Sequence, residues 1–205
     1  MSSDTDIANR AMRLLKANRI TSLTDGSNNA NAANDVFTEV REDLLRAHNW
    51  NFAQKWAKLA KLSEAPAFEF DNAFALPADW LRTVTVHDND AGVGPPPLYR
   101  EGEIDDQGAI LSSADEMWMR YIYRLTDPNR MAADFRAAFA FALALAIPGI
   151  PNLSAGREER LEKRAEVRLR RAKHADAMGS TPEKRPVGSW VTSRGGWPPT
   201  RAWPG

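Results

Sequence analysis

A run of eleven residues without a polar side chain, 137–147, most constrains what this chain can fold into. Its alternation of Ala with larger apolar residues would suit a strand, but Ala is the strongest helix former, and Asp127 followed by Pro128 is typical of a helix start. Pro148 and Gly149 predict the end of the helix. The run is too short for a membrane span, which needs ~18 residues. We therefore expect a helix at the centre of the core. Its large buried side chains would be Phe139, Phe141, Leu143, Leu145 and Ile147.

Three further helices are predicted around this one. The first two begin at candidate N-caps, Ser3 or Asp4 and then Ser27, and the third covers 154–178 with a narrow apolar stripe. Between them the apolar period shortens to two residues, which is typical of strands. The expected strands lie at 53–62, 83–87, 98–100, 109–112 and 117–124.

These patterns predict a mainly α protein with some α+β character. A four-helix bundle core, residues 1–51 and 126–178, would carry a small inserted antiparallel β-domain at 52–125. An extended C-terminal docking arm would follow at 179–205. The first residues lack a basic leader or an apolar run, so no signal peptide is expected.

The charge of the chain is balanced overall and uneven along its length. Residues 152–205 hold 12 Lys/Arg against 6 Asp/Glu, whereas residues 1–151 hold 15 against 21. This asymmetry favours head-to-tail contact between copies, or a basic face toward nucleic acid. Cysteine is absent, which excludes disulfides and thiolate metal sites and favours an intracellular origin.

The segment 179–205 contains five Pro and five Gly and cannot build a core of its own. Its three evenly spaced tryptophans, Trp190, Trp197 and Trp203, are candidate anchors on another surface. We expect an arm that docks on a neighbouring subunit or on another protein. The alternative is an arm that folds back on its own domain.

Five arginines recur on the last predicted helix at spacings of three and four residues, which places them in one row. They are Arg157, Arg160, Arg164, Arg168 and Arg171. Three interpretations stay open: a solvated face, contact with acidic residues of an adjacent subunit, or contact with phosphates.

Catalytic and metal-binding signals are weak. No P-loop, dinucleotide fingerprint, GxSxG or HExxH occurs, so we expect no enzyme and no cofactor. His48, His87 and His174 fall on three different elements without an evident partner. The acidic loops offer carboxylates for a hard cation, but no known ligand spacing matches, and solvated loop charge is the simpler interpretation. These carboxylates belong to Asp88, Asp90, Glu101, Glu103, Asp105 and Asp106.

Three stretches together resemble one family of proteins. They are IANRAMRLLKANRITSLTDGSNNANAANDVF at 7–37, VREDLLRAHNWNFAQKWAKLA at 40–60 and FALPADWLR at 74–82. The chain resembles here the head-to-tail adaptors of short-tailed phages, the tail tubular protein A family. The likeness covers about the first 85 residues, and its motifs are structural ones, without an active site.

The resemblance implies a structural virion protein of the tail or neck, assembled in the host cytoplasm. Such a protein would form a homo-oligomeric ring of about twelve copies between the portal protein and the tail nozzle, tail tubular protein B. Double-stranded DNA would pass through its lumen without sequence-specific binding, and no membrane would be involved. The Trp-rich arm and the Arg row would bind the portal or a neighbouring subunit. A nucleic-acid-binding accessory protein that uses the Arg row is the alternative.

Overall fold

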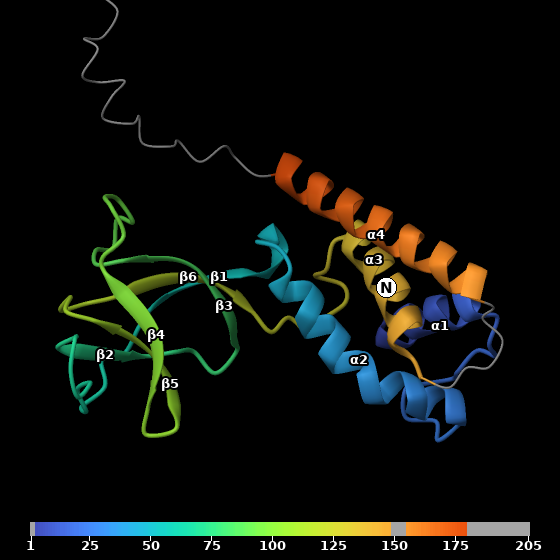
Figure 1. Cartoon of the computed structure of the whole chain (residues 1–205), viewed down its shortest axis with the longest axis horizontal. Coiled ribbons are helices and arrows are strands. Elements are labelled where there is room, and N and C mark those ends of the chain that lie inside the picture. The colour runs from blue at the N-terminus through green and yellow to red at the C-terminus, as the bar shows by residue number, and fades with distance from the viewer. Residues whose placement is uncertain (1–2, 149–154, 180–205) are drawn as a thin grey trace, which may run out of the picture.

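The computed structural model describes residues 3–148 and 155–179. In this part of the chain, α1 (Asp4–Leu15), α2 (Asn28–Arg46), α3 (Ala133–Ala146) and α4 (Ala155–Met178) form a helical half (Figure 1). A short 3-10 turn, η1 (Asn51–Ala53), leads into the strands. The strands are β1 (Gln54–Lys58), β2 (Asn72–Ala75), β3 (Trp80–His87), β4 (Tyr99–Ile104), β5 (Gln107–Ser112) and β6 (Trp118–Tyr123).

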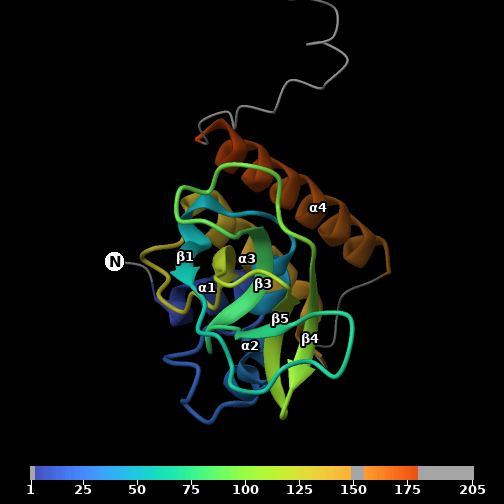
Figure 2. The ribbon, with the colours of Figure 1, turned by 90° about the vertical axis from the view of Figure 1, so that its left-hand side faces the viewer.

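The strands form two antiparallel sheets. Sheet A has the order β1-β6-β3, and sheet B has the order β2-β5-β4. Residues 60–62 leave sheet A and run beside β2, where Leu62 N donates to Ala73 O and Ala75 N donates to Ala60 O, both at 2.8 Å. This crossing joins the two sheets, which face the viewer in front of the helices in Figure 2.

The expected four-helix bundle with a small β insertion is therefore wrong. The described residues form a mixed α+β fold with two three-stranded antiparallel sheets. One hydrophobic cluster runs from the helices into both sheets and includes Phe135 of α3, Ile122 of sheet A and Ile110 of sheet B. Sheet A lies directly on the helices, because α2 packs against β3 and β6 as well as against α3.

The central helix is confirmed, with two corrections. α3 packs against α1, α2 and α4, and Phe139, Phe141, Leu143 and Ile147 are buried, but Leu145 is 38% exposed. Leu145 lies near the end of α3, and its exposure shows that an apolar sequence did not require burial on every face.

The start of this helix also differs from the expectation. Asp127 closes a separate turn, in which its Oδ1 accepts from Asn129 N at 2.9 Å. α3 begins only at Ala133, after an N-cap, Ala132, that makes no side-chain cap bond. Arg136 holds the turn against the helix by donating from Nη1 to Pro128 O (2.9 Å) and Met131 O (2.6 Å).

The other helix starts are confirmed. Ser3 caps α1 in a reciprocal capping box with Asp6, and the Ser27 hydroxyl accepts from Ala30 N at the start of α2. The expected strands are also present, although β2 has no counterpart among them. No helix in the described ranges is long and apolar enough to cross a bilayer.

Candidate functional site

Three of the five row arginines contact other helices, although Arg164 and Arg168 stay exposed. Arg157 of α4 donates from Nη2 to the backbone oxygen of Leu14 in α1 at 3.2 Å. The guanidinium carbons of Arg164 and Arg168 lie 5.3 and 6.0 Å from the centre of the Phe141 ring, at cation–π distance. These contacts position the row along α1 and α3. The two remaining members, Arg160 and Arg171, are exposed.

Two hollows of about 380 and 330 Å³ lie where α4 meets α1 and α3, and both are lined by Leu14. We call them together the basic groove. Its seven cationic side chains are Arg10, Arg13, Lys16, Arg157, Arg160, Arg164 and Arg168. Arg171 does not line it. The sequence predicted the α4 contribution but not the three cations that α1 adds.

Among the described residues, the basic groove has no internal compensation for its charge. No carboxylate is among the described residues that line the two hollows. None of the seven cations takes part in an ion pair within residues 3–148 and 155–179. The seven positive charges repel one another, so an anionic partner placed in the basic groove would relieve that repulsion.

Carboxylates gather in the sheets instead. Residues 52–125 hold seven Lys/Arg against twelve Asp/Glu. Exposed Glu101 and Glu103 lie on β4, and Asp105 and Asp106 form the turn to β5 with φ of 49° and 60°. The Asp105 carboxyl hydrogen-bonds to Glu64 and repels its charge, which raises the pKa of Glu64. The β4–β5 hairpin is therefore an acidic tip.

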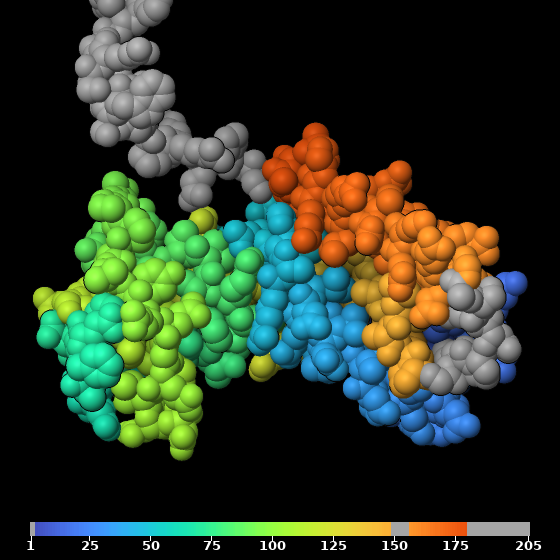
Figure 3. Space-filling model, viewed as in Figure 1, coloured from blue at the N-terminus to red at the C-terminus, as the bar shows by residue number. Residues whose placement is uncertain are grey.

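The basic groove and the acidic tip belong to different ends of the molecule. The helical half occupies one end of the long axis, where α1 and the first turns of α4 lie, and the sheets occupy the other (Figures 1 and 3). The described chain thus separates its charges in space and not only along the sequence.

The acidic loops assemble no metal site from the residues that the structure describes. Within the part of the chain that the structure describes, no group of three or more His, Cys, Asp or Glu side chains is placed to hold an ion. Arg100 instead pairs with Glu69 at 2.9 Å, beside this surface.

His48 has a carboxylate partner, contrary to the expectation that no histidine would have one. Its Nε2 lies 3.3 Å from Oδ2 of Asp176, near the end of α4. Asp176 also accepts from Asn51 N at 3.1 and 3.2 Å, and Asn51 Nδ2 donates to Asp176 O at 2.7 Å. Burial raises the pKa of Asp176, and the bonds from Asn51 and His48 oppose that shift. This cluster fixes the end of α4 beside the start of β1.

A second polar cluster occupies the LPADWLR stretch. Asp79 accepts from Lys55 Nζ at 2.5 Å and from the Tyr121 hydroxyl at 2.9 Å. Burial and the Asp79 carboxylate together raise the pKa of Tyr121. These contacts tie β1 and β6 to the loop before β3.

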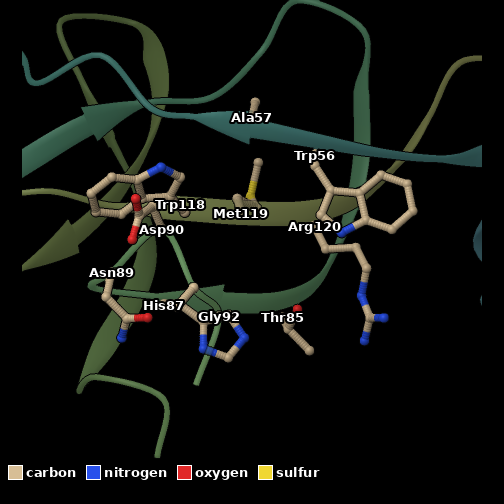
Figure 4. A pocket seen from close by; sticks show the side chains of 11 residues that line it. Trp56, Ala57, Thr85, His87, Asn89, Asp90, Gly92, Trp118, Met119 and Arg120 are labelled. Carbon is tan, nitrogen blue, oxygen red and sulfur yellow. The ribbon is translucent and has the colours of Figure 1, made fainter. Parts of the chain in front are cut away.

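The exposed face of sheet A carries a pocket of about 380 Å³ that the sequence did not predict. Trp56 and Trp118 lie at its two ends, with His87, Thr85 and Arg120 along one side (Figure 4). The indole of Trp56 is 71% exposed, so it contributes little to the core. A rim loop, residues 89–92, completes the lining.

The three arm tryptophans, Trp190, Trp197 and Trp203, lie outside the described residues, as do all positions of the arm beyond Gly179. His174 is exposed on α4.

A scan against models of known protein families finds no match for this chain, and a search of curated proteins finds no match either.

Proposed function

We propose that this protein is a structural component of a phage virion, a head-to-tail adaptor that forms a ring of about twelve copies between the portal and the tail nozzle. The separation of a basic groove from an acidic tip is the observation that carries the proposal. A contact between two different surfaces of identical copies is heterologous, and it closes into a ring when the rotation between copies permits.

In the proposed ring, the β4–β5 tip of one subunit lies against the basic groove of the next. Glu101 and Glu103 are exposed and do not pack in the core. They can therefore contact Arg13 and Arg164 of the next subunit without unfolding the sheets or the helices. The C-terminal arm reaches the portal, and the genome passes through the lumen without base-specific contacts.

The family-like stretches have structural roles that suit an adaptor scaffold. Asn9, Asp25 and Asp79 belong to them, and each binds backbone or side chains across a loop. In the described residues these stretches supply the packing of α1 on the following loop and the start of sheet A. Such roles support a shared fold and carry no implication of catalysis.

A charge-swap series tests the ring contact. Arg13→Glu with Arg164→Glu should abolish assembly of the full chain on purified portal rings, measured by mass photometry. Adding Glu101→Arg and Glu103→Arg to that variant should restore it, because the interface then has the opposite polarity. Arg46→Glu with Arg170→Glu, two exposed changes outside the groove, is the matched control. Normal assembly of the groove variant would contradict the proposal.

Two further measurements address the portal contact and the rival function. Deleting residues 180–205 should leave a folded protein that no longer joins portal-containing heads, scored by electron microscopy. A salt titration of DNA binding tests the nucleic-acid-binding alternative, which is favoured by the seven groove cations because none has an ion-pair partner in the part of the chain that the structure describes. Tight binding that falls steeply with salt would support that alternative, whereas weak binding supports a passive conduit.

A further inference from the structure

The pocket on sheet A is not used by the proposed adaptor contacts. Its two indoles come from neighbouring strands, because Trp56 of β1 pairs with Arg120 of β6, and Lys58 pairs with Trp118. The Lys58 ammonium lies 4.8 Å from the centre of the Trp118 ring and binds Glu116, which fixes one end of the pocket. Of the two indoles, Trp56 is 71% exposed and Trp118 is partly exposed, which is unusual for large apolar side chains.

The rim of the pocket is preformed. Asn89 Nδ2 donates to Val93 O at 2.9 Å, and Val93 N donates to Asn89 Oδ1 at 3.2 Å, so the loop is closed by its own hydrogen bonds. His87 lines the pocket and has a buried Nδ1 without a hydrogen-bond partner among the described residues. This nitrogen has no accessible surface, so an occupant of the pocket would meet the rest of the imidazole ring.

The chemistry of the lining suits a proline-rich peptide. Polyproline II segments are extended before they bind, expose their carbonyl groups and pack their rings on aromatic side chains. A groove lined by two indoles, with a histidine beside them, offers both kinds of contact. The carboxylate of Asp90 on the rim adds a site for a cationic side chain.

The chain itself contains such a peptide. Residues 197–199 read Trp-Pro-Pro, and Arg194 and Arg201 flank them. Residues 180–205 carry four Lys/Arg and one Glu, whereas residues 52–125 carry seven Lys/Arg and twelve Asp/Glu. Arm and sheets are therefore complementary in charge.

The place where the arm begins favours docking within one subunit. Asp176 is bound to Asn51, and Trp56 lies five residues further on, past the 3-10 turn and into β1, so at most about 17 Å away at ~3.3 Å per residue. The eighteen residues from Gly179 to Trp197 have a root-mean-square span of about 25 Å as a flexible chain. A tether whose span matches the distance gives an effective concentration near millimolar, which free copies in dilute solution do not reach.

We propose that the sheet A pocket binds residues 197–199 of the same subunit, with the two proline rings on Trp56 and Trp118 and a flanking arginine against Asp90. The arm is thereby held on its own sheet in the free subunit. This inference goes beyond the adaptor function and does not depend on ring formation.

Photo-crosslinking of the dilute full-length protein tests the site and the source of the peptide. With p-benzoylphenylalanine in place of Ala91 on the rim, we expect crosslinks to peptides from residues 190–203 in a product of monomer mass. The same amino acid in place of Glu103, on the distant acidic tip, is the control. Crosslinks that appear only in a product of dimer mass would assign the pocket to a second copy, and absence of arm crosslinks would remove the arm as occupant. Either result overturns the proposal.

Trypsin sensitivity gives an independent readout. Trp56→Ala should accelerate cleavage after Arg194 and Arg201 by about fivefold or more, because cleavage follows the undocked population. Phe68→Ala is the matched control, since Phe68 is 79% exposed and does not line the pocket. Circular dichroism would check that both variants stay folded. Equal cleavage rates in Trp56→Ala and the unaltered chain would contradict docking, even if portal assembly proceeds as proposed.

Discussion

The side chain of Asn9 forms a pair of hydrogen bonds with the backbone of Ile20. Asn9 Nδ2 donates to Ile20 O, and Ile20 N donates to Asn9 Oδ1, both at 2.9 Å and both buried. The side chain of Asn9 in α1 therefore satisfies both backbone hydrogen-bonding groups of Ile20, which lies in the loop after the helix. The loop is fixed to the helix by this pair and not by apolar packing alone.

Asn9→Ala should lower the free energy of unfolding by about 2–3 kcal/mol, because it removes two hydrogen bonds and leaves two buried backbone groups unsatisfied. Urea denaturation would measure the loss. Asn29→Ala serves as control, since Asn29 makes one exposed hydrogen bond to Asn18 O at 3.2 Å and should cost less than about 1 kcal/mol. Equal effects of the two changes would refute the importance of the buried pair.

Phe139→Ala should cost about 3–5 kcal/mol, because Phe139 is fully buried and its ring packs 4.9 Å from that of Phe37. Leu145→Ala on the same helix should cost less than about 1 kcal/mol, since Leu145 is 38% exposed. Thermal and urea unfolding of both variants would test this contrast. A loss for Leu145→Ala as large as for Phe139→Ala would mean that Leu145 is covered in the protein in solution.

Asp25 should make stability depend on pH in the acid range. Hydrogen bonds from Ser27, with others from Thr21 and Ser22, lower the pKa of Asp25 to about 2. Because the folded pKa lies below the unfolded value of 3.8, this stabilisation is present above pH ~4 and is lost as the pH falls toward 2. Unfolding curves of Asp25→Asn and the unaltered chain should therefore differ at pH 6 and converge near pH 2. Asp35→Asn, an exposed change on α2, should give no such convergence.

Asp176→Ala should loosen the end of α4. The substitution removes the carboxylate that accepts from Asn51 N and lies beside His48. We expect faster amide hydrogen exchange in residues 170–178, with global stability changed by less than about 1 kcal/mol. Glu162→Ala, on an exposed part of the same helix, is the control. Unchanged exchange at the end of α4 would show that packing on α3 alone holds it.

The elements of this fold with a strong local signal could be predicted from the sequence. Ser3 and Ser27 stand at the caps of α1 and α2, and the alternating residues of β6 are clear because a strand at the centre of sheet A is buried along most of its length. Asp127 was misleading because an Asp-Pro pair favours a tight turn as well as a helix start. The turn formed, and the helix began later.

The way the helices and strands are arranged in space was harder to predict from the sequence. β2 is only four residues long, and it forms a strand by pairing with β5. That pairing joins residues far apart in the sequence, so a local pattern does not reveal it. The division into two sheets arises where residues 60–62 leave sheet A and bond to β2 instead. No local sequence pattern predicts that change of partner. The mixed architecture was therefore missed although most strands were found.

The candidate surfaces were predicted in part. Helical spacing placed the Arg row on one side of α4, but the cations of α1 that complete the basic groove come from a helix far away in sequence. Trp56 had a usable signal, because Gln54 and Lys58, two residues away on either side, are polar and share its face of β1. A tryptophan between polar neighbours at period two indicates an exposed aromatic.

The pairing of β1 with β6 has a consequence for how this protein can change over time. Gln54 lies opposite Ile122, so the chain passes into the sheets and back to the helices through two adjacent strands. The β4–β5 hairpin lies beyond these two strands and has no extensive packing on the helices among the described residues, so it can lengthen or shorten without moving the points where the chain joins them. The sequence of this hairpin can therefore vary while the helices keep theirs.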